Sequence, residues 1–343
     1  MFKKQFSWPL FLIFFVLVLG TSYGDEEEKE SPRKVLSHAI KKGDLLQVQS
    51  LIESKTVGIE ELRERDRKGL TPLVEAAGKG QFSIIKYLIE KGASIEGVAG
   101  KRSTPLTRLI KKASSKLPST QLMEIIRYLV DAGVDVNSAG ENEYTPLMLA
   151  CKYTRGVELV EMLLDLGALA DVQAADKNTA FLLCIRNTNV KAFRLLLKRG
   201  ANTSTIFNGV TPLGIAAAEG KIVMAKLIIE EMKADVNKYD PAGGTPIFWA
   251  AMFGQESMVS FLAEKGADIN ARTINPIDVE KQPKNNYSLS LTKTYVTFPK
   301  NSTPLTFAKW AGSISTINLI CDLGGIEPEQ IELKEWTKSL WGL

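Results

Sequence analysis

The sequence predicts an all-α repeat solenoid of helix–turn–helix units joined by short hairpin loops. The first observation is a recurring Thr-Pro-Leu tripeptide. The second is the spacing of its threonines, near copies included, which is 33, 41, 34, 32, 34 and 58 residues. A period near 33 is typical of stacked repeats. The third is glycine at fixed offsets after these threonines. The threonines that start full copies are Thr71, Thr104, Thr145, Thr211 and Thr303, and those of near copies are Thr179 and Thr245.

The unit that begins at Thr71 shows what each element requires. Thr71 is a good helix N-cap, because its hydroxyl can accept from the free amides of the first turn. Pro72 fits the first helical position, where its missing amide costs nothing. Gly80 ends this first helix, and Gly92 fits the left-handed position that ends a second one. The second helix is predicted from apolar residues at helical spacing, which are Ile84, Ile85, Leu88 and Ile89.

One such unit cannot bury its apolar face alone, so it must stack on neighbours. The same offsets recur along the chain. Gly220, Gly254 and Gly312 lie nine residues after their threonines, as Gly80 does. The alanine pairs on the first helices let neighbouring helices approach closely, and they are Ala76-Ala77, Ala216-Ala217 and Ala250-Ala251.

These features together resemble the ankyrin-repeat family, including repeat ends such as Gly133-Val134-Asp135-Val136-Asn137 and Gly266-Ala267-Asp268-Ile269-Asn270. The resemblance covers residues 34–326 and implies about eight units. It implies an ankyrin-repeat stack and a binding role, but it says almost nothing about the partner. The units start near residues 34, 71, 104, 145, 179, 211, 245 and 303.

The chain departs from the family pattern at two kinds of position. The histidine that usually follows Thr-Pro-Leu is absent from every repeat, so its bonds between repeats must be replaced or missing. Insertions lengthen two of the repeats, one at roughly 111–120 and a larger one at 273–300. The larger insertion alternates apolar and polar residues and is then β-rich, which predicts a long finger or an enlarged β-hairpin.

The two ends of the chain predict separate segments. Residues 1–24 have two lysines, an apolar run of ten residues and small residues near Gly24, the pattern of a secretory signal peptide. Cleavage after Ser22 and an uncleaved anchor are the alternatives. Residues 25–33 form an acidic, flexible lead-in, and residues 327–343 fit a cap over the last repeat.

The charge balance gives no reason to expect a nucleic-acid partner. The chain holds 43 Lys and Arg against 39 Asp and Glu, a net charge of +4, and removing the two lysines of the leader leaves +2. Nucleic-acid binding would require a concentrated basic face. We expect an exported monomer with no stable membrane span after signal cleavage, periplasmic in a bacterium or secreted.

The reactive side chains do not suggest an enzyme, a cofactor or a metal site. His38 is the single histidine and falls on the degenerate first unit. Cys151, Cys184 and Cys321 are predicted to be small buried residues. A disulfide between Cys151 and Cys184 is not expected, because repeats stack about 10 Å apart, beyond the reach of that bond.

Side chains that folding does not require predict the partner-binding surface. In the resemblance, hairpin positions before Thr-Pro-Leu and the positions after the alanine pair line one concave face. Its amino-terminal half is basic and its carboxy-terminal half aromatic and apolar, which is how a binding hot spot is built. The alternative is that some of these residues pack against the insertion or the next repeat. The predicted residues are Arg67, Lys68, Lys111, Lys112, Tyr144, Tyr153, Phe207, Val210, Met252, Phe253 and Trp310.

The sequence therefore predicts a non-catalytic, exported scaffold that binds a protein through this face. Two alternatives use the same face. One is an accessory or inhibitory factor for an exported enzyme, and the other is a secreted effector that binds host proteins.

Overall fold

A computed structural model gives the structure of the chain. It describes residues 31–326 except 64–65, 67–68, 96–102, 154–156, 281–294 and 299. The predicted signal peptide, most of the acidic lead-in and the predicted carboxy-terminal cap lie outside the described residues. No helix of the described part is long and apolar enough to cross a membrane.

The described residues form two compact units, the first comprising residues 31–76 and 81–94 and the second residues 77–80 and 95–326. Helices α2 and α3 of the first unit are joined at Gly43, and the carboxylate of Asp44 caps α3 by accepting from the amide of Gln47 at 2.9 Å. The helices that begin in this unit are α2 (Pro32–Lys42), α3 (Leu45–Glu53), α4 (Ile59–Arg63), α5 (Pro72–Lys79) and α6 (Phe82–Glu90).

A buried carboxylate ties α2 to α5 within the first unit. Glu75 is almost fully buried and accepts from the hydroxyl of Ser37 at 2.8 Å. The guanidinium of Arg33 and the ammonium of Lys41 lie 3.7 Å and 3.4 Å from its two oxygens. These partners offset the cost of removing the charge from water. His38, predicted to lie at the surface, is exposed.

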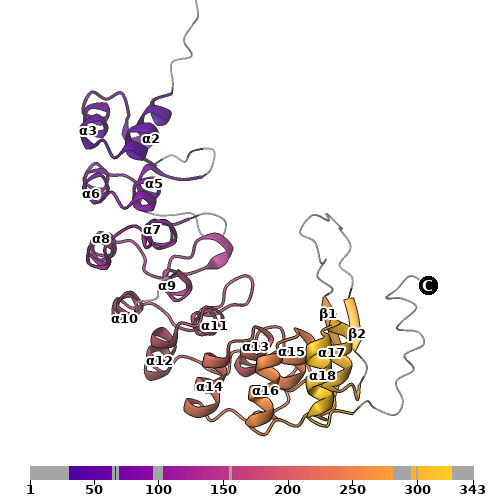
Figure 1. Ribbon diagram of the computed structural model, residues 1–343. Helices are drawn as coiled ribbons and strands as arrows, with labels where there is room; N and C mark the ends of the chain where they lie inside the picture. Colours follow the sequence, from indigo (N-terminus) through magenta and orange to yellow (C-terminus); the bar gives the residue numbers. More distant parts are fainter. Residues whose placement is uncertain are drawn as a thin grey trace, which may run out of the picture. The chain divides into compact units, whose positions relative to one another are not determined.

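The second unit is a series of helix pairs, which Figure 1 shows side by side. The first helices are α7 (Pro105–Ala113), α9 (Pro146–Tyr153), α11 (Ala180–Arg186), α13 (Pro212–Ala218), α15 (Pro246–Met252) and α17 (Pro304–Ala311). The second helices are α8 (Ser119–Asp131), α10 (Glu158–Asp165), α12 (Val190–Lys198), α14 (Ile222–Glu231), α16 (Glu256–Glu264) and α18 (Ile314–Asp322). This is the all-α repeat architecture that the sequence predicts.

Most of the repeated threonines cap the first helices as predicted, whereas the Thr245 hydroxyl makes no cap bond to α15. The hydroxyl of Thr179 accepts from the amide of Leu182, and that of Thr211 accepts from the amide of Gly214. Thr104 forms a capping box with Thr107, whose hydroxyl accepts from the Thr104 amide at 2.8 Å. Thr107 occupies a position where the family usually has histidine, so in this repeat a threonine takes over part of that polar role.

Small residues let consecutive first helices pack directly on one another. Ala216, Ala217, Ala250 and Ala251 have no exposed surface, and α13 packs against α15. Gly220 ends α13 with a positive φ of 65°, and a Cβ there would overlap the side-chain amide of Gln255 in the next repeat. The positive φ favours glycine at this position, whereas the flexible end of the Gln255 side chain can move aside.

Asparagine side chains join the ends of consecutive repeats on the side of the second helices. The amide of Asn237 donates to the carbonyl of Gly266 at 2.9 Å, and its oxygen accepts from the amide of Asp268 at 2.7 Å. Asn137 and Asn270 make the same pair of bonds to their next repeats. These bonds supply the links between repeats that the missing histidines leave open.

The two insertions take different forms. The shorter one lengthens the second helix, since α8 has 13 residues, and also the turn before it, which spans residues 114–118. The longer one contains an antiparallel pair of strands, β1 (Ile277–Glu280) and β2 (Tyr295–Phe298), which confirms the predicted hairpin. The segment that joins the two strands lies outside the described residues.

An aromatic cluster fixes the base of this hairpin to the last repeat. The ring of Phe298 is fully buried and stacks on Phe307 of α17 with centroids 4.0 Å apart. The edge of Trp310 meets Phe298 at 5.4 Å, and Phe248 of the preceding repeat lies 5.2 Å from Phe307. The hairpin base is therefore part of the core.

We expect Phe298→Ala to lower the free energy of unfolding of the carboxy-terminal repeats by about 3–5 kcal/mol, because it removes a buried ring and leaves a cavity. Urea denaturation followed by far-UV circular dichroism measures this loss. Phe253→Ala is the matched control, since Phe253 is 55% exposed. Equal losses in both variants would show that Phe298 does not anchor the hairpin.

Candidate protein-interaction surface

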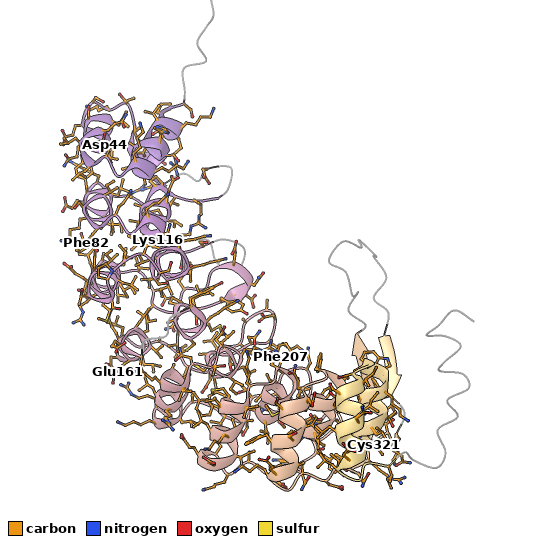
Figure 2. The ribbon with its side chains drawn as sticks, in the orientation of Figure 1. Asp44, Phe82, Lys116, Glu161, Phe207 and Cys321 are labelled. Atoms are coloured by element: carbon orange, nitrogen blue, oxygen red, sulfur yellow. The ribbon has the colours of Figure 1, made fainter. Side chains whose placement is uncertain are left out.

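The candidate surface consists of the carboxyl ends of the first helices and the hairpin tips that precede them, called here the first-helix face. Each first helix of the second unit follows directly on a threonine of the repeat pattern, so equivalent positions of successive repeats project to the same side. Figure 2 labels Phe207 on a hairpin tip of this side and Glu161 on the side of the second helices.

A small surface pocket lies where α7 and α9 meet the hairpin tip at Glu141–Glu143. The ammonium of Lys152 lies 5.0 Å from the ring centroid of Tyr144 and 5.5 Å from that of Tyr153, within the range of cation–π attraction. Tyr153 is 46% exposed. The pocket is lined by Ser103, Thr107, Lys111, Glu141, Asn142, Tyr144, Leu149, Lys152 and Tyr153.

Lys111 at this pocket forms an ion pair with Glu141. The hydrogen bond and the charge of Lys111 lower the pKa of Glu141, so this carboxylate stays ionised at neutral pH. The predicted basic half is therefore partly neutralised by the chain itself. Lys112 is exposed, and Arg67 and Lys68 lie outside the described residues.

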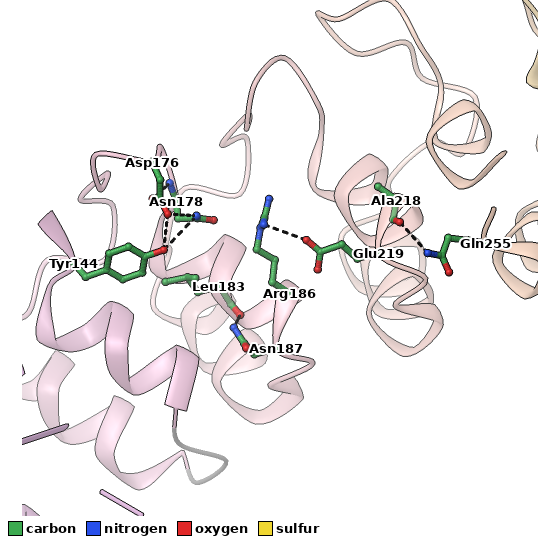
Figure 3. Close-up of polar contacts among 9 residues, drawn as sticks. All are labelled: Tyr144, Asp176, Asn178, Leu183, Arg186, Asn187, Ala218, Glu219 and Gln255. Carbon is green, nitrogen blue, oxygen red and sulfur yellow. Dashed lines mark hydrogen bonds and ion pairs between the residues drawn. The ribbon is translucent and has the colours of Figure 1, made fainter. Parts of the chain in front are cut away.

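Tyr144 belongs to the hairpin network and does not project to solvent, which corrects the prediction. It is 8% exposed, and its hydroxyl donates to Asp176 Oδ2 of the next hairpin at 2.6 Å (Figure 3). Asn178 Nδ2 donates to the same oxygen at 2.8 Å. Burial and the bond to Asp176 raise the pKa of Tyr144 to about 12. Although desolvation raises the pKa of Asp176, the hydrogen bonds from Tyr144 and Asn178 lower it overall.

Arg186 at the end of α11 connects two consecutive repeats through Phe207 and Glu219. Its guanidinium carbon lies 4.4 Å from the ring centroid of Phe207, and Nη1 lies 3.1 Å from Glu219 Oε1 (Figure 3). Burial raises the pKa of Glu219, and the positive charge of Arg186 opposes that rise. Phe207 is half-buried and forms a backbone bridge with Val210, also half-buried. The ring of Phe207 thus contacts Arg186 and is also partly exposed to solvent.

Two residues of the predicted aromatic half are less exposed to a partner than predicted. Met252 is 3% exposed and belongs to the core of α15, so its assignment to the surface is wrong. Trp310 is half-buried, because it packs edge-on against Phe298 of the hairpin. Phe253, one residue after Met252, is the exposed side chain at this repeat.

The sequence reasoning gave no role to Asp176 or Asn178, which organise the hairpin tip before Thr179. An available signal was the Asp-x-Asn sequence just before Thr179, because short polar side chains fold back on tight turns. Cys321 is exposed on α18, so the prediction that all three cysteines are buried is wrong for this one.

Comparison with known proteins gives a consistent family match. The family described as "Ankyrin repeats (3 copies)" matches residues 13–99, 36–139, 119–206 and 200–273. Alpha-latrocrustotoxin-Lt1a of Latrodectus tredecimguttatus is 29% identical over 173 residues, which are 45% of this chain and 12% of the toxin. A putative ankyrin repeat protein of fowlpox virus is 34% identical over 148 residues, covering 41% of this chain and 43% of the viral protein.

A bacterial relative is also similar to part of the chain. A putative ankyrin repeat protein of Borreliella burgdorferi is 29% identical over 94 residues, which are 27% of this chain and 42% of that protein. The chain thus spans less than half the length of each of these three relatives.

We expect Tyr144→Phe to destabilise the fold by about 1 kcal/mol at pH 7, because the carboxylate of Asp176, which is exposed to solvent, loses the hydrogen bond from the Tyr144 hydroxyl. The lowered pKa of Asp176 gives the sign of the pH dependence. The stabilisation that ionised Asp176 provides is complete above the pKa of this carboxyl in the unfolded chain, near 3.8. It is lost as the pH falls through the lower pKa of the folded chain.

Urea denaturation of wild type and Tyr144→Phe at pH 7 and at pH 3 measures this difference. The difference in free energy of unfolding between the two proteins should be smaller at pH 3 than at pH 7. Tyr153→Phe, at an exposed tyrosine of the neighbouring helix end, is the matched control and should leave stability unchanged. A gap that is the same at both pH values would contradict the role of Asp176.

Proposed function

Because the chain belongs to the ankyrin-repeat family, we propose that it is a non-catalytic scaffold that binds another protein through its first-helix face. The observation that carries this proposal is the exposure of two aromatic rings at positions that stacking does not require. Tyr153 and Phe253 each stand at the end of a first helix, 46% and 55% exposed. Exposed aromatic side chains on a rigid support are typical anchors of protein interfaces.

The polar groups between these rings support specific recognition. Lys152 is adjacent to Tyr153, and Arg186 and Glu219 lie on the two repeats that follow. This alternation of signs favours a partner segment that carries both an apolar anchor and charged groups, of which an acidic one would meet Lys112 and Lys152.

A non-catalytic role is also supported by the side chains that the chain offers. Its single histidine, His38, is exposed on α2. The relatives that match are likewise matched through repeats, which cover small shares of the longer proteins.

The location that we propose is outside the cytoplasm, in a bacterial periplasm or the surrounding medium. The support is the pattern of residues 1–24, in which lysines precede ten apolar residues and then small ones. Removal of this segment leaves a chain of nearly balanced charge, which suits a protein partner better than a nucleic acid.

The test is capture of partners from native envelope and medium fractions with wild type and a Tyr153→Ala/Phe253→Ala double variant. We expect the double variant to lose capture by about tenfold or more, since truncating two anchors removes several kcal/mol of binding energy. Its melting temperature should be nearly unchanged, because exposed side chains contribute little to folding.

The matched control is Val223→Ala/Ile314→Ala, which removes two exposed apolar side chains from the first turns of second helices α14 and α18. This control should capture the partner like wild type. Capture that survives in the Tyr153/Phe253 variant but falls in the control would move the binding surface to the second helices. Phe207→Ala is less suited to this test, because Phe207 also supports Arg186.

A further inference from the structure

Two cysteines of consecutive repeats face each other inside the second unit. Cys151 lies on α9 and Cys184 on α11, and these first helices approach within 8 Å between Cα atoms. Both side chains are fully buried. They stand 33 residues apart, close to one repeat period, so stacking brings equivalent helix positions together.

The two thiols lie close together across the interface between the repeats, where both side chains are fully buried and α9 packs against α11. The neighbouring Cys151 thiol adds to the effect of burial in raising the pKa of Cys184. The same interface is held from the other side by Asn189, whose amide donates to the carbonyl of Cys151 at 3.4 Å. Both cysteines carry free thiols in this structure, as expected from the sequence, although small side chains let α9 and α11 approach closely.

We propose that Cys151 and Cys184 are a disulfide site that covalently joins two consecutive repeats under oxidising conditions. The two sulfurs are already neighbours, and a disulfide requires them to come together to about 2.05 Å. Side-chain rotation and a small shift of two short helices supply this movement, since neither thiol is held by a third partner among the described residues.

The reaction is thiol–disulfide exchange with an external disulfide, either a small molecule or a protein. One cysteine, as thiolate, attacks the reagent and releases one of its thiols, which leaves a mixed disulfide. The second thiolate then attacks the cysteine sulfur of that bond and releases the second thiol of the reagent. Two protein thiols are oxidised, and the reagent disulfide is reduced to two thiols.

Burial determines when this exchange can take place. Loss of water around the Cys184 thiol and its contact with Cys151 raise its pKa, so the folded pair holds little reactive thiolate. Exchange must therefore occur during folding or when the two repeats separate briefly. Cys321 is exposed, so it provides an internal standard for an accessible thiol.

The first measurement is thiol accessibility in the reduced wild-type chain. Iodoacetamide should modify Cys321 promptly and the other two only after urea denaturation, as mass spectrometry of peptides would show. Prompt modification of Cys151 or Cys184 in the folded chain would contradict the buried pair.

The second measurement is oxidative refolding of a Cys321→Ser chain from urea with oxidised and reduced glutathione. We expect the main product to contain a Cys151–Cys184 disulfide, to have the circular dichroism spectrum of the reduced chain, and to melt several degrees higher. A cross-link that closes a loop of this length restricts the unfolded chain. Cys184→Ser in the same background is the matched control and should contain no internal disulfide.

Three outcomes would overturn the proposal. One is a refolded chain with both thiols still reduced, and another is one that carries glutathione on each cysteine. The third is a linked product that melts below the reduced chain, which would mean that native packing cannot accept the bond. The linked product with native spectrum and raised melting temperature supports the proposal.

Discussion

Direct packing of one first helix on the next is the interaction from which most features of this chain follow. A pair of short helices has an apolar face that it cannot cover by itself, and alanine pairs let the neighbouring repeat cover it closely. The same close approach places Gly220, which turns the chain with a positive φ, against the side-chain amide of Gln255 in the next repeat. It also explains why the long insertion is anchored by Phe298, since a hairpin at the last interface must join the core that it borders.

Stacking alone would leave polar backbone groups of the turns without partners, and buried groups of this kind are costly. The chain satisfies them with side chains that reach into the next repeat. Asn137, Asn237 and Asn270 each bond to the glycine carbonyl and to a nearby amide of that repeat. Tyr144 joins consecutive hairpin tips in a different way, by donating to the side-chain carboxylate of Asp176. Several separate links of this kind make a histidine in every repeat unnecessary.

The fold could be predicted in detail because its signals are local. A threonine cap, a proline at the first helical position and a glycine at a left-handed turn each depend on a few neighbouring residues, and they recur in one register. The exposure of the candidate site could not be predicted in the same way. Met252 and Phe253 are adjacent, yet the first is core and the second exposed. Trp310 stands at an equivalent position and is covered by Phe298, which comes from an insertion that the repeat pattern does not describe.

The exposed aromatic residues and the cysteine pair are connected by the same packing. Cys151 directly precedes Lys152 and Tyr153, so a bond to Cys184 would fix α9 against α11 just below the pocket at Tyr153. Since each repeat contacts only its neighbours, that restraint would act on Tyr153 and Arg186 and hardly at all on Phe253, which lies on α15 and two repeats further along the chain. For a partner that contacts both Tyr153 and Phe253, formation of the disulfide would therefore restrain the end of the binding site at Tyr153 and leave the end at Phe253 unchanged.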